Sequence, residues 1–478
     1  MAVSVPRWLP LVLIALAALW LRTHDLSRRA MHADEANQAV KTGQLLETGY
    51  YAFDPRDHHG PTLYYAALPI AWIRGEFSLN TLTETSVRLV PAIMGTIGVV
   101  LLGWLATPFG RWPASAAAAF MAVAPPAVYY SRYFIQETLL VTFTLSAMLC
   151  AQHWWRRGQL AWALGTGACL GLMQATKASA PLFIVAAAIA LIAFRPFRPV
   201  SPHPLRALSA AVLAGLAVAA LFYSSFGSHL SGLRDAVSVY GPAADRATGE
   251  SGHEKPWWYY LQLFAWQREG GLVWQQVAFS SAVLIGLITA FAHRSKFLLR
   301  VALYTGLIAV ALSLTPYKTP WHSVHLVPGF SILAASALTL IPRVWLSVPL
   351  VVVVLYFQLT QTQLIAFLRP HDVRNPYAYV HSSPDVTRVR TLAEAALQRS
   401  PDGVIKIISE EYWPLPWYLR GLSSIGYWDA PPADCDAALV VASVEHADVV
   451  RARLTGTYRE SYLGLRPGFL LVVFTSTP

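Results

Sequence analysis

The sequence predicts an all-α polytopic membrane protein with about 11 transmembrane helices and a small exterior C-terminal α/β domain. Of its 478 residues, 55% are hydrophobic and 13% are charged, about half the charged fraction of an ordinary soluble protein. The mean hydropathy is +0.43, and residues 371–478 hold 22 of the 62 charged residues. The same composition excludes a disordered, collagen-like or disulfide-stabilised chain.

Eleven apolar runs are candidates for transmembrane helices, because a spanning helix needs about 20 apolar residues. The run Pro61–Ile73 is too short, and we expect it to be interfacial or re-entrant instead. The eleven candidate spans lie near residues 8–22, 87–107, 113–130, 138–155, 160–176, 180–194, 206–223, 272–291, 298–314, 322–341 and 344–366.

Basic loops orient these spans by the positive-inside rule. They predict a multi-pass protein of the plasma (cytoplasmic) membrane, with its N-terminus inside and its C-terminal domain outside. One loop disagrees with this orientation, because Arg22, Arg28 and Arg29 fall outside. Membrane topology thus explains the basic excess, and no nucleic-acid partner is expected. The basic residues on the inside are Arg111, Arg156, Arg157, Arg195, Arg198, Arg206, the stretch His293–Arg300, and Arg343.

Two parts are predicted along the chain. Residues 1–370 form the transmembrane domain, with long exterior loops at 23–86 and 224–271, the second of them mobile. Residues 371–478 form an exterior soluble α/β domain. Its alternating patterns predict helices at 386–398 and 444–454, and strands at 404–409, 437–442 and 469–474.

The first exterior loop is rich in ionisable side chains, among them Asp34, Glu35, His58 and His59. A carboxylate beside a membrane cleft can act as a base, a metal ligand or a hydrogen-bond acceptor. Asp34 also stands where a helix N-cap belongs, before a helix-like apolar spacing. Capping and catalysis are compatible, and both stay open for Asp34.

Further charged residues stand at the exterior ends of the spans. In Tyr129–Thr138, Arg132 and Glu137 are either functional or an ion pair that pins a loop. Lys177 and Lys318 could each bind a phosphate, or simply extend toward the membrane interface.

Aromatic residues gather at Trp257–Tyr260, Trp321 and Glu411–Arg420. They could contact a sugar or a polyprenyl chain, or form an interfacial belt. His322 and His325 have no third ligand nearby, so a zinc site is not expected. No cofactor follows from the sequence, and the need for a divalent metal stays open.

Six segments occur in an order that resembles a known family: HADEA, HHGPTLYY, SRYFIQET, TK, YKTPWH and EYWPLPWYLR. The chain is similar, from about Trp8 to its end, to the flippase-activity-associated membrane proteins. These belong to the GT-C glycosyltransferase superfamily, with the protein O-mannosyltransferases and aminoarabinose transferases as relatives. The last segment is the one that points to the narrower family.

The resemblance implies an enzyme that uses a polyprenyl-phosphate sugar at the exterior membrane face. It implies that Asp34 activates an acceptor hydroxyl, with Glu35 as its partner and Glu137 as the acidic residue of the second exterior loop. Ala178 departs from the acidic residue that often follows TK, which weakens a phosphate role for Lys177. The implied donor-phosphate or substrate-binding residues are His58, His59, Tyr64, Arg132, Tyr133, Lys177, Lys318, Trp321 and His322.

The resulting hypothesis is a membrane glycosyltransferase that acts on a lipid-linked sugar donor. Membrane lipids are further partners, and the acceptor is an unidentified glycan, lipid or protein. A non-catalytic flippase or transporter component for polyprenyl-linked sugars is the alternative, because intramembrane charges would serve it equally well. A third possibility is a scaffold whose tail recruits cell-envelope enzymes.

Overall fold

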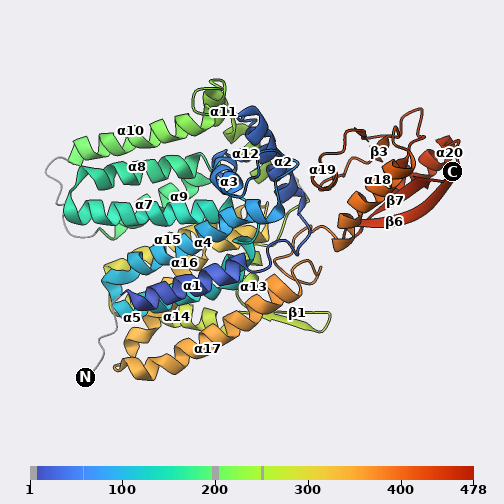
Figure 1. The fold of residues 1–478 in the computed structure, drawn as a ribbon. Helices are drawn as coiled ribbons and strands as arrows, with labels where there is room; N and C mark the ends of the chain where they lie inside the picture. Colours follow the sequence, from blue (N-terminus) through green and yellow to red (C-terminus); the bar gives the residue numbers. More distant parts are fainter. Residues whose placement is uncertain (1–7, 58, 196–203, 249–251, 478) are drawn as a thin grey trace.

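The computed structural model describes residues 8–57, 59–195, 204–248 and 252–477. Each predicted span contains a helix, and the helices form one bundle (Figure 1). Five of the described helices are long and apolar enough to cross a membrane, and others are shorter. The bundle helices are α1 (Leu9–Thr23), α4 (Glu84–Ala106), α5 (Arg111–Val123), α6 (Pro125–Tyr130), α7 (Glu137–Arg157), α8 (Leu160–Gln174), α9 (Ala180–Ala193), α10 (Pro204–Tyr223), α14 (Val277–Ala292), α15 (Lys296–Leu314), α16 (Val327–Ser336) and α17 (Val344–Thr362).

Three predicted spans differ in detail from the structure. The run 113–130 is two helices, because Ala124 is extended and Pro125 lacks an amide hydrogen to continue α5. The run 272–291 begins as strand β2 (Leu272–Gln275), and the run 322–341 begins in the 3₁₀ helix η2 (Pro320–His325). Arg198, expected inside, lies outside the described residues.

Small residues let the bundle helices approach closely. Helix α8 packs on α10 through Gly167, where an added Cβ would lie 1.9 Å from the carbonyl oxygen of Ala211. At the periphery, α10 exposes apolar side chains such as Leu213 and Leu216. An apolar exterior of this kind suits contact with lipid.

The two long loops that were predicted to be exterior, 23–86 and 224–271, are more ordered than the sequence suggests. The first contains α2 (Ala33–Thr48) and α3 (Thr62–Ile73), the short helix expected not to span. The second was expected to be a mobile loop, yet its described residues form helices and strand β1 (Trp266–Glu269), which pairs with β2. Its helices are α11 (Gly232–Ser238), α12 (Tyr240–Thr248) and α13 (Tyr259–Leu263).

The C-terminal part is a small α/β domain, as predicted. Its sheet has the order β4-β3-β5-β7-β6, parallel over the first three strands and antiparallel over the rest. Strands β4 and β6 were not predicted. The elements are α18 (Arg388–Arg399), β3 (Ile405–Ile408), α19 (Leu415–Tyr418), β4 (Ile425–Trp428), β5 (Leu439–Ser443), α20 (Val444–Arg453), β6 (Tyr458–Arg466) and β7 (Phe469–Ser476).

This domain contacts the bundle beside α2 (Figure 1). The Tyr418 hydroxyl accepts a hydrogen bond of 2.8 Å from the amide of Met31, and the indole of Trp417 donates one of 2.7 Å to Glu84. The EYWPLPWYLR segment therefore helps to hold the two parts together. Residues 370–383, which we call the strap, connect α17 to this domain, and several of them contact the helical part.

Candidate functional site

The carboxylate of Asp34 lies at the start of α2 and is partly open to solvent. His32, not Asp34, is the N-cap residue, so the capping expectation for Asp34 was wrong. The amide of Asp34 donates to His32 Nδ1 at 3.0 Å. Its carboxylate accepts no hydrogen bond from the described residues, and 38% of its side-chain surface is exposed. The carboxylate of Asp34 is therefore accessible to a molecule outside the protein.

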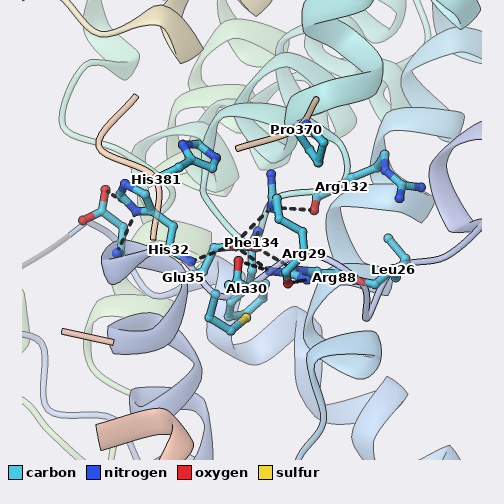
Figure 2. Close-up of polar contacts among 12 residues, drawn as sticks. Leu26, Arg29, Ala30, His32, Glu35, Arg88, Arg132, Phe134, Pro370 and His381 are labelled. Carbon is cyan, nitrogen blue, oxygen red and sulfur yellow. Dashed lines mark hydrogen bonds and ion pairs between the residues drawn. The ribbon is translucent and has the colours of Figure 1, made fainter. Parts of the chain in front are cut away.

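Glu35 meets the opposite environment, because it is fully buried among cations. Its oxygens accept from Arg88 at 2.8 and 2.9 Å and from Arg29 at 3.1 Å. The amides of Phe134 and His32 add two further bonds (Figure 2). Against the effect of burial, Arg29 and Arg88 lower the pKa of Glu35 to about 2. Glu35 thus joins the segment before α2, helix α4 and the segment before α7, and it does not face solvent.

The side chain of Arg132 binds the end of α1 and the start of the loop that follows it. Its guanidinium donates to the carbonyls of Leu21 and Asp25, among others, and lies 4.5 Å from the ring of Phe367. The expected pair of Arg132 with Glu137 does not form. Next to it, Tyr133 lies under the guanidinium of Arg29 at 4.5 Å.

Glu137, Lys177 and His322 form a second cluster from three distant segments. The ammonium of Lys177 donates to Glu137. His322 Nε2 lies 3.3 Å from the Lys177 nitrogen and 4.0 Å from a Glu137 oxygen. The structure therefore brings together three of the predicted site residues.

Lys318 lies between α15 and η2 and is almost fully buried. Its ammonium donates to the carbonyl of Thr315 and has no carboxylate partner among the described residues. Burial lowers the pKa of Lys318. A buried cation without a counter-ion is a candidate for binding an anion.

The HHGPTLYY and TK segments also meet. The amide of Gly60 donates to the carbonyl of Thr176 at 3.1 Å, and the hydroxyls of Thr62 and Thr176 are 2.8 Å apart. A Cβ on Gly60 would lie 2.1 Å from a carbonyl oxygen, so this contact needs glycine. Tyr64 is buried nearby, His59 has partial exposure, and His58 lies outside the described residues.

Several residues of the site escaped the sequence analysis, above all Arg88, His32 and the strap residues Tyr379 and His381. Arg88 carried a signal, because a charge at the start of an apolar span needs a partner. The ring of Trp321 lies 6.4 Å from His32 and 5.7 Å from Tyr379. The described residues contain no group of three side chains arranged to hold a metal ion.

Known structures share this arrangement of helices and C-terminal domain. The crystal structure of ArnT from Cupriavidus metallidurans bound to undecaprenyl phosphate matches with a TM-score of 0.68, covering 97% of each chain at 17% identity. The chain has the GT-C fold. A second GT-C structure, the oligosaccharyltransferase AglB from Archaeoglobus fulgidus, matches with a TM-score of 0.55 at 13% identity, over 95% of this chain and 72% of the other.

Sequence comparison agrees with the GT-C fold. Residues 67–223 match the family described as dolichyl-phosphate-mannose-protein mannosyltransferase. Over 170 residues, 34% of this chain, the sequence is 33% identical to the "Putative mannosyltransferase YycA" of Bacillus subtilis (strain 168), and it spans 24% of that relative's length. The predicted GT-C fold of a multi-pass membrane protein is therefore confirmed, while membership of the superfamily and of the narrower flippase-associated family stays a prediction.

Proposed function

We propose that the protein is a polyprenyl-phosphate-dependent membrane glycosyltransferase with Asp34 as its general base. The observation that carries the proposal is the contrast between its carboxylates. Glu35 and Glu137 are buried and neutralised by cations, whereas Asp34 is partly exposed and its carboxylate is free of hydrogen bonds within the described chain. A general base must be able to reach the proton that it takes.

The GT-C relatives support the donor class. ArnT was crystallised with undecaprenyl phosphate, and AglB with a dolichol-phosphate and an inhibitory peptide. A lipid phosphate of this kind suits a chain with many apolar helices and with buried cations such as Lys177 and Lys318. We infer a polyprenyl-phosphate sugar as donor and an acceptor hydroxyl, on a glycan, lipid or protein, at the exterior membrane face.

In the proposed reaction, the acceptor oxygen attacks the anomeric carbon while Asp34 takes the hydroxyl proton. The bond from that carbon to the phosphate oxygen breaks, and polyprenyl phosphate leaves with the electron pair. The products are the glycosylated acceptor and protonated Asp34, with inversion at the anomeric carbon. Because phosphate needs little protonation to leave, one base can suffice here, whereas glycosidases commonly need two carboxyl groups.

In this reaction, cations would stabilise the negative charge on the departing phosphate. Lys318 has no counter-ion in the described chain, so it is the cation best able to stabilise the departing phosphate. Lys177 would contribute while it remains paired with Glu137 and close to His322. Glu35 was expected to be a catalytic partner, but its buried contacts favour a positioning role. Arg132 likewise serves the loop that carries Asp34.

The test uses purified protein in liposomes with a panel of polyprenyl-phosphate sugars and follows the release of polyprenyl phosphate. We expect Asp34→Asn to lower turnover by about 10²–10⁴-fold, the usual contribution of a positioned base. Asp235→Asn, in exterior helix α11, is the matched control and should retain activity. Normal turnover by Asp34→Asn would remove the proposed base. Movement of donor between leaflets without release would favour the flippase alternative.

A further inference from the structure

The start of α2 is held by a histidine with two different partners. His32 Nδ1 accepts from the amide of Asp34 at 3.0 Å, and His32 Nε2 lies 3.1 Å from the carbonyl oxygen of Tyr379 in the strap. A carbonyl oxygen can only accept, so the hydrogen of the neutral ring is on Nε2. Nδ1 then keeps the lone pair that the Asp34 amide needs, and both bonds exist together in this one tautomer.

The surroundings of His32 favour that neutral form. The ring is buried, with 4% of the residue exposed, and burial lowers the pKa of His32. The ring of His381 lies 5.2 Å away (Figure 2), and that of Tyr133 lies at 5.4 Å. His32 therefore has little freedom to reorient.

The strap carbonyl that holds His32 is itself fixed. His381 Nδ1 also lies 3.1 Å from the Tyr379 oxygen, and His381 Nε2 is 2.8 Å from the hydroxyl of Tyr129 in α6. The next residue, Val380, has φ of +50°. A β-branched residue rarely adopts this conformation, which orients the peptide group containing the Tyr379 carbonyl.

The part of the strap that precedes Tyr379 is also anchored to the bundle. The side-chain amide of Asn375 donates to the carbonyls of Ile365 and Arg369 at 3.0 and 2.8 Å. The hydroxyl of Tyr130 donates to the carbonyl of Tyr377 at 2.8 Å. These bonds fix the strap independently of α2.

We propose that His32 is a positioning residue that couples the strap to the Asp34 carboxylate through its two ring nitrogens. This proposal rests on the proposed function, because it gives His32 a role in orienting the base. Neither ring nitrogen alone is sufficient to orient Asp34. The cap bond fixes the backbone of Asp34, and the strap bond fixes the ring that makes the cap.

Two substitutions of His32 each keep one of its two hydrogen bonds and remove the other. In His32→Asn, the side-chain oxygen replaces Nδ1 and keeps the helix cap, but the side chain is too short to reach Tyr379. In His32→Gln, the side-chain amide nitrogen replaces Nε2 and keeps the strap bond, but the cap is lost. His446→Asn and His446→Gln are matched controls, because His446 Nε2 also lies 3.0 Å from a backbone carbonyl, that of Asp429, on the exposed soluble domain.

Both His32 variants should lower kcat for sugar release by about tenfold or more, as misplacement of a catalytic group does, with KM for the donor within about twofold. A structural cap alone would leave His32→Asn fully active, since Asn is a preferred N-cap residue. Wild-type kcat in either variant would therefore overturn the coupling. The His446 variants should match wild type.

A second measurement does not depend on activity. Hydrogen exchange of the peptide around Asp34 should quicken about tenfold in His32→Gln, which loses the cap, and by a smaller factor in His32→Asn, which keeps the cap without the strap bond. The ¹⁵N spectrum of labelled histidine, assigned with these variants, should show the His32 hydrogen on Nε2. A hydrogen on Nδ1, or unchanged exchange in His32→Gln, would refute the positioning role. Absence of sugar release by wild type, with these signatures present, would instead refute the proposed function alone.

Discussion

Two adjacent carboxylates, Asp34 and Glu35, meet different electrostatic environments. On α2 they point to different neighbours, one toward solvent and the other into a buried pocket of guanidinium groups. Replacing a buried ion pair by apolar groups can be neutral, but removing one partner leaves an uncompensated charge. The stability of the first exterior loop therefore depends on Glu35 more than on Asp34.

Glu35→Gln should destabilise the protein by about 3–5 kcal/mol at neutral pH, because Arg88 is left buried without its carboxylate. The measurement is thermal unfolding in detergent. Asp34→Asn is the matched control and should unfold within about 1 kcal/mol of wild type. Equal unfolding of wild type and Glu35→Gln would show that the arginines find other partners.

The carboxylate of Glu35 should also make the free energy of unfolding depend on pH. Its folded-state pKa of about 2 lies below its usual value of 4.5, so its contribution is fully present above about pH 4.5. That contribution, on the order of 3 kcal/mol, should be lost as the pH falls from 4.5 toward 2. Unfolding measured across this window should show a steeper loss for wild type than for Glu35→Gln. If the free energy of unfolding fell equally with pH in wild type and in Glu35→Gln, the low pKa of Glu35 would be contradicted.

At the scale of single elements, close backbone contacts decide how the bundle packs. Helices α8 and α10 meet at Gly167 and Gly171, where the neighbouring carbonyl oxygens leave no room for a side chain. Such small-residue contacts replace the hydrophobic driving force that water supplies to soluble proteins.

Gly167→Leu should therefore push α10 away from α8 and lower stability by several kcal/mol, since overpacking costs about 1–3 kcal/mol and occasionally more. Thermal unfolding in detergent measures the effect. Gly241→Leu is the control, because a Cβ there would meet nothing within 4 Å. If both variants unfold alike, the close approach of α8 and α10 does not limit stability.

Sequence periodicity was sufficient to predict the bundle helices and insufficient to define their ends. Each apolar run contains a helix, and the short length of Pro61–Ile73 correctly predicted a short helix there. The same runs hid β2 and η2, because a short apolar segment reads alike as strand, 3₁₀ turn or helix. Residue types also singled out Asp34 and Glu137. Their partners could not be predicted, since the Glu35–Arg88 and Glu137–Lys177 pairs join residues far apart in the chain.

At the scale of the whole molecule, charge and fold indicate one orientation. The C-terminal end of α7, which carries Arg156 and Arg157, lies at the end of the bundle opposite the C-terminal domain (Figure 1). The positive-inside rule then predicts that this end faces the cytoplasm and that the C-terminal domain lies outside.

Single cysteines can test this orientation in a background without Cys150, Cys169 and Cys435. Asp448→Cys, at an exposed site of α20, should react with a membrane-impermeant maleimide in intact cells. Arg157→Cys should react only after the membrane is permeabilised. The reverse pattern would invert the topology and place Asp34 inside.

The strap has a consequence for the order of biosynthesis. A chain is made from its N-terminus at about 5–20 residues per second, so α2 is synthesised well before Tyr379 and Tyr418. Roughly 20–70 s separate the two at that rate. During this interval, the first exterior loop lacks the contacts of His32 with Tyr379 and of Met31 with Tyr418. Under the proposed function, a truncated or half-translated chain would hold Asp34 poorly oriented, and only a finished chain would be ready to act on a lipid-linked sugar.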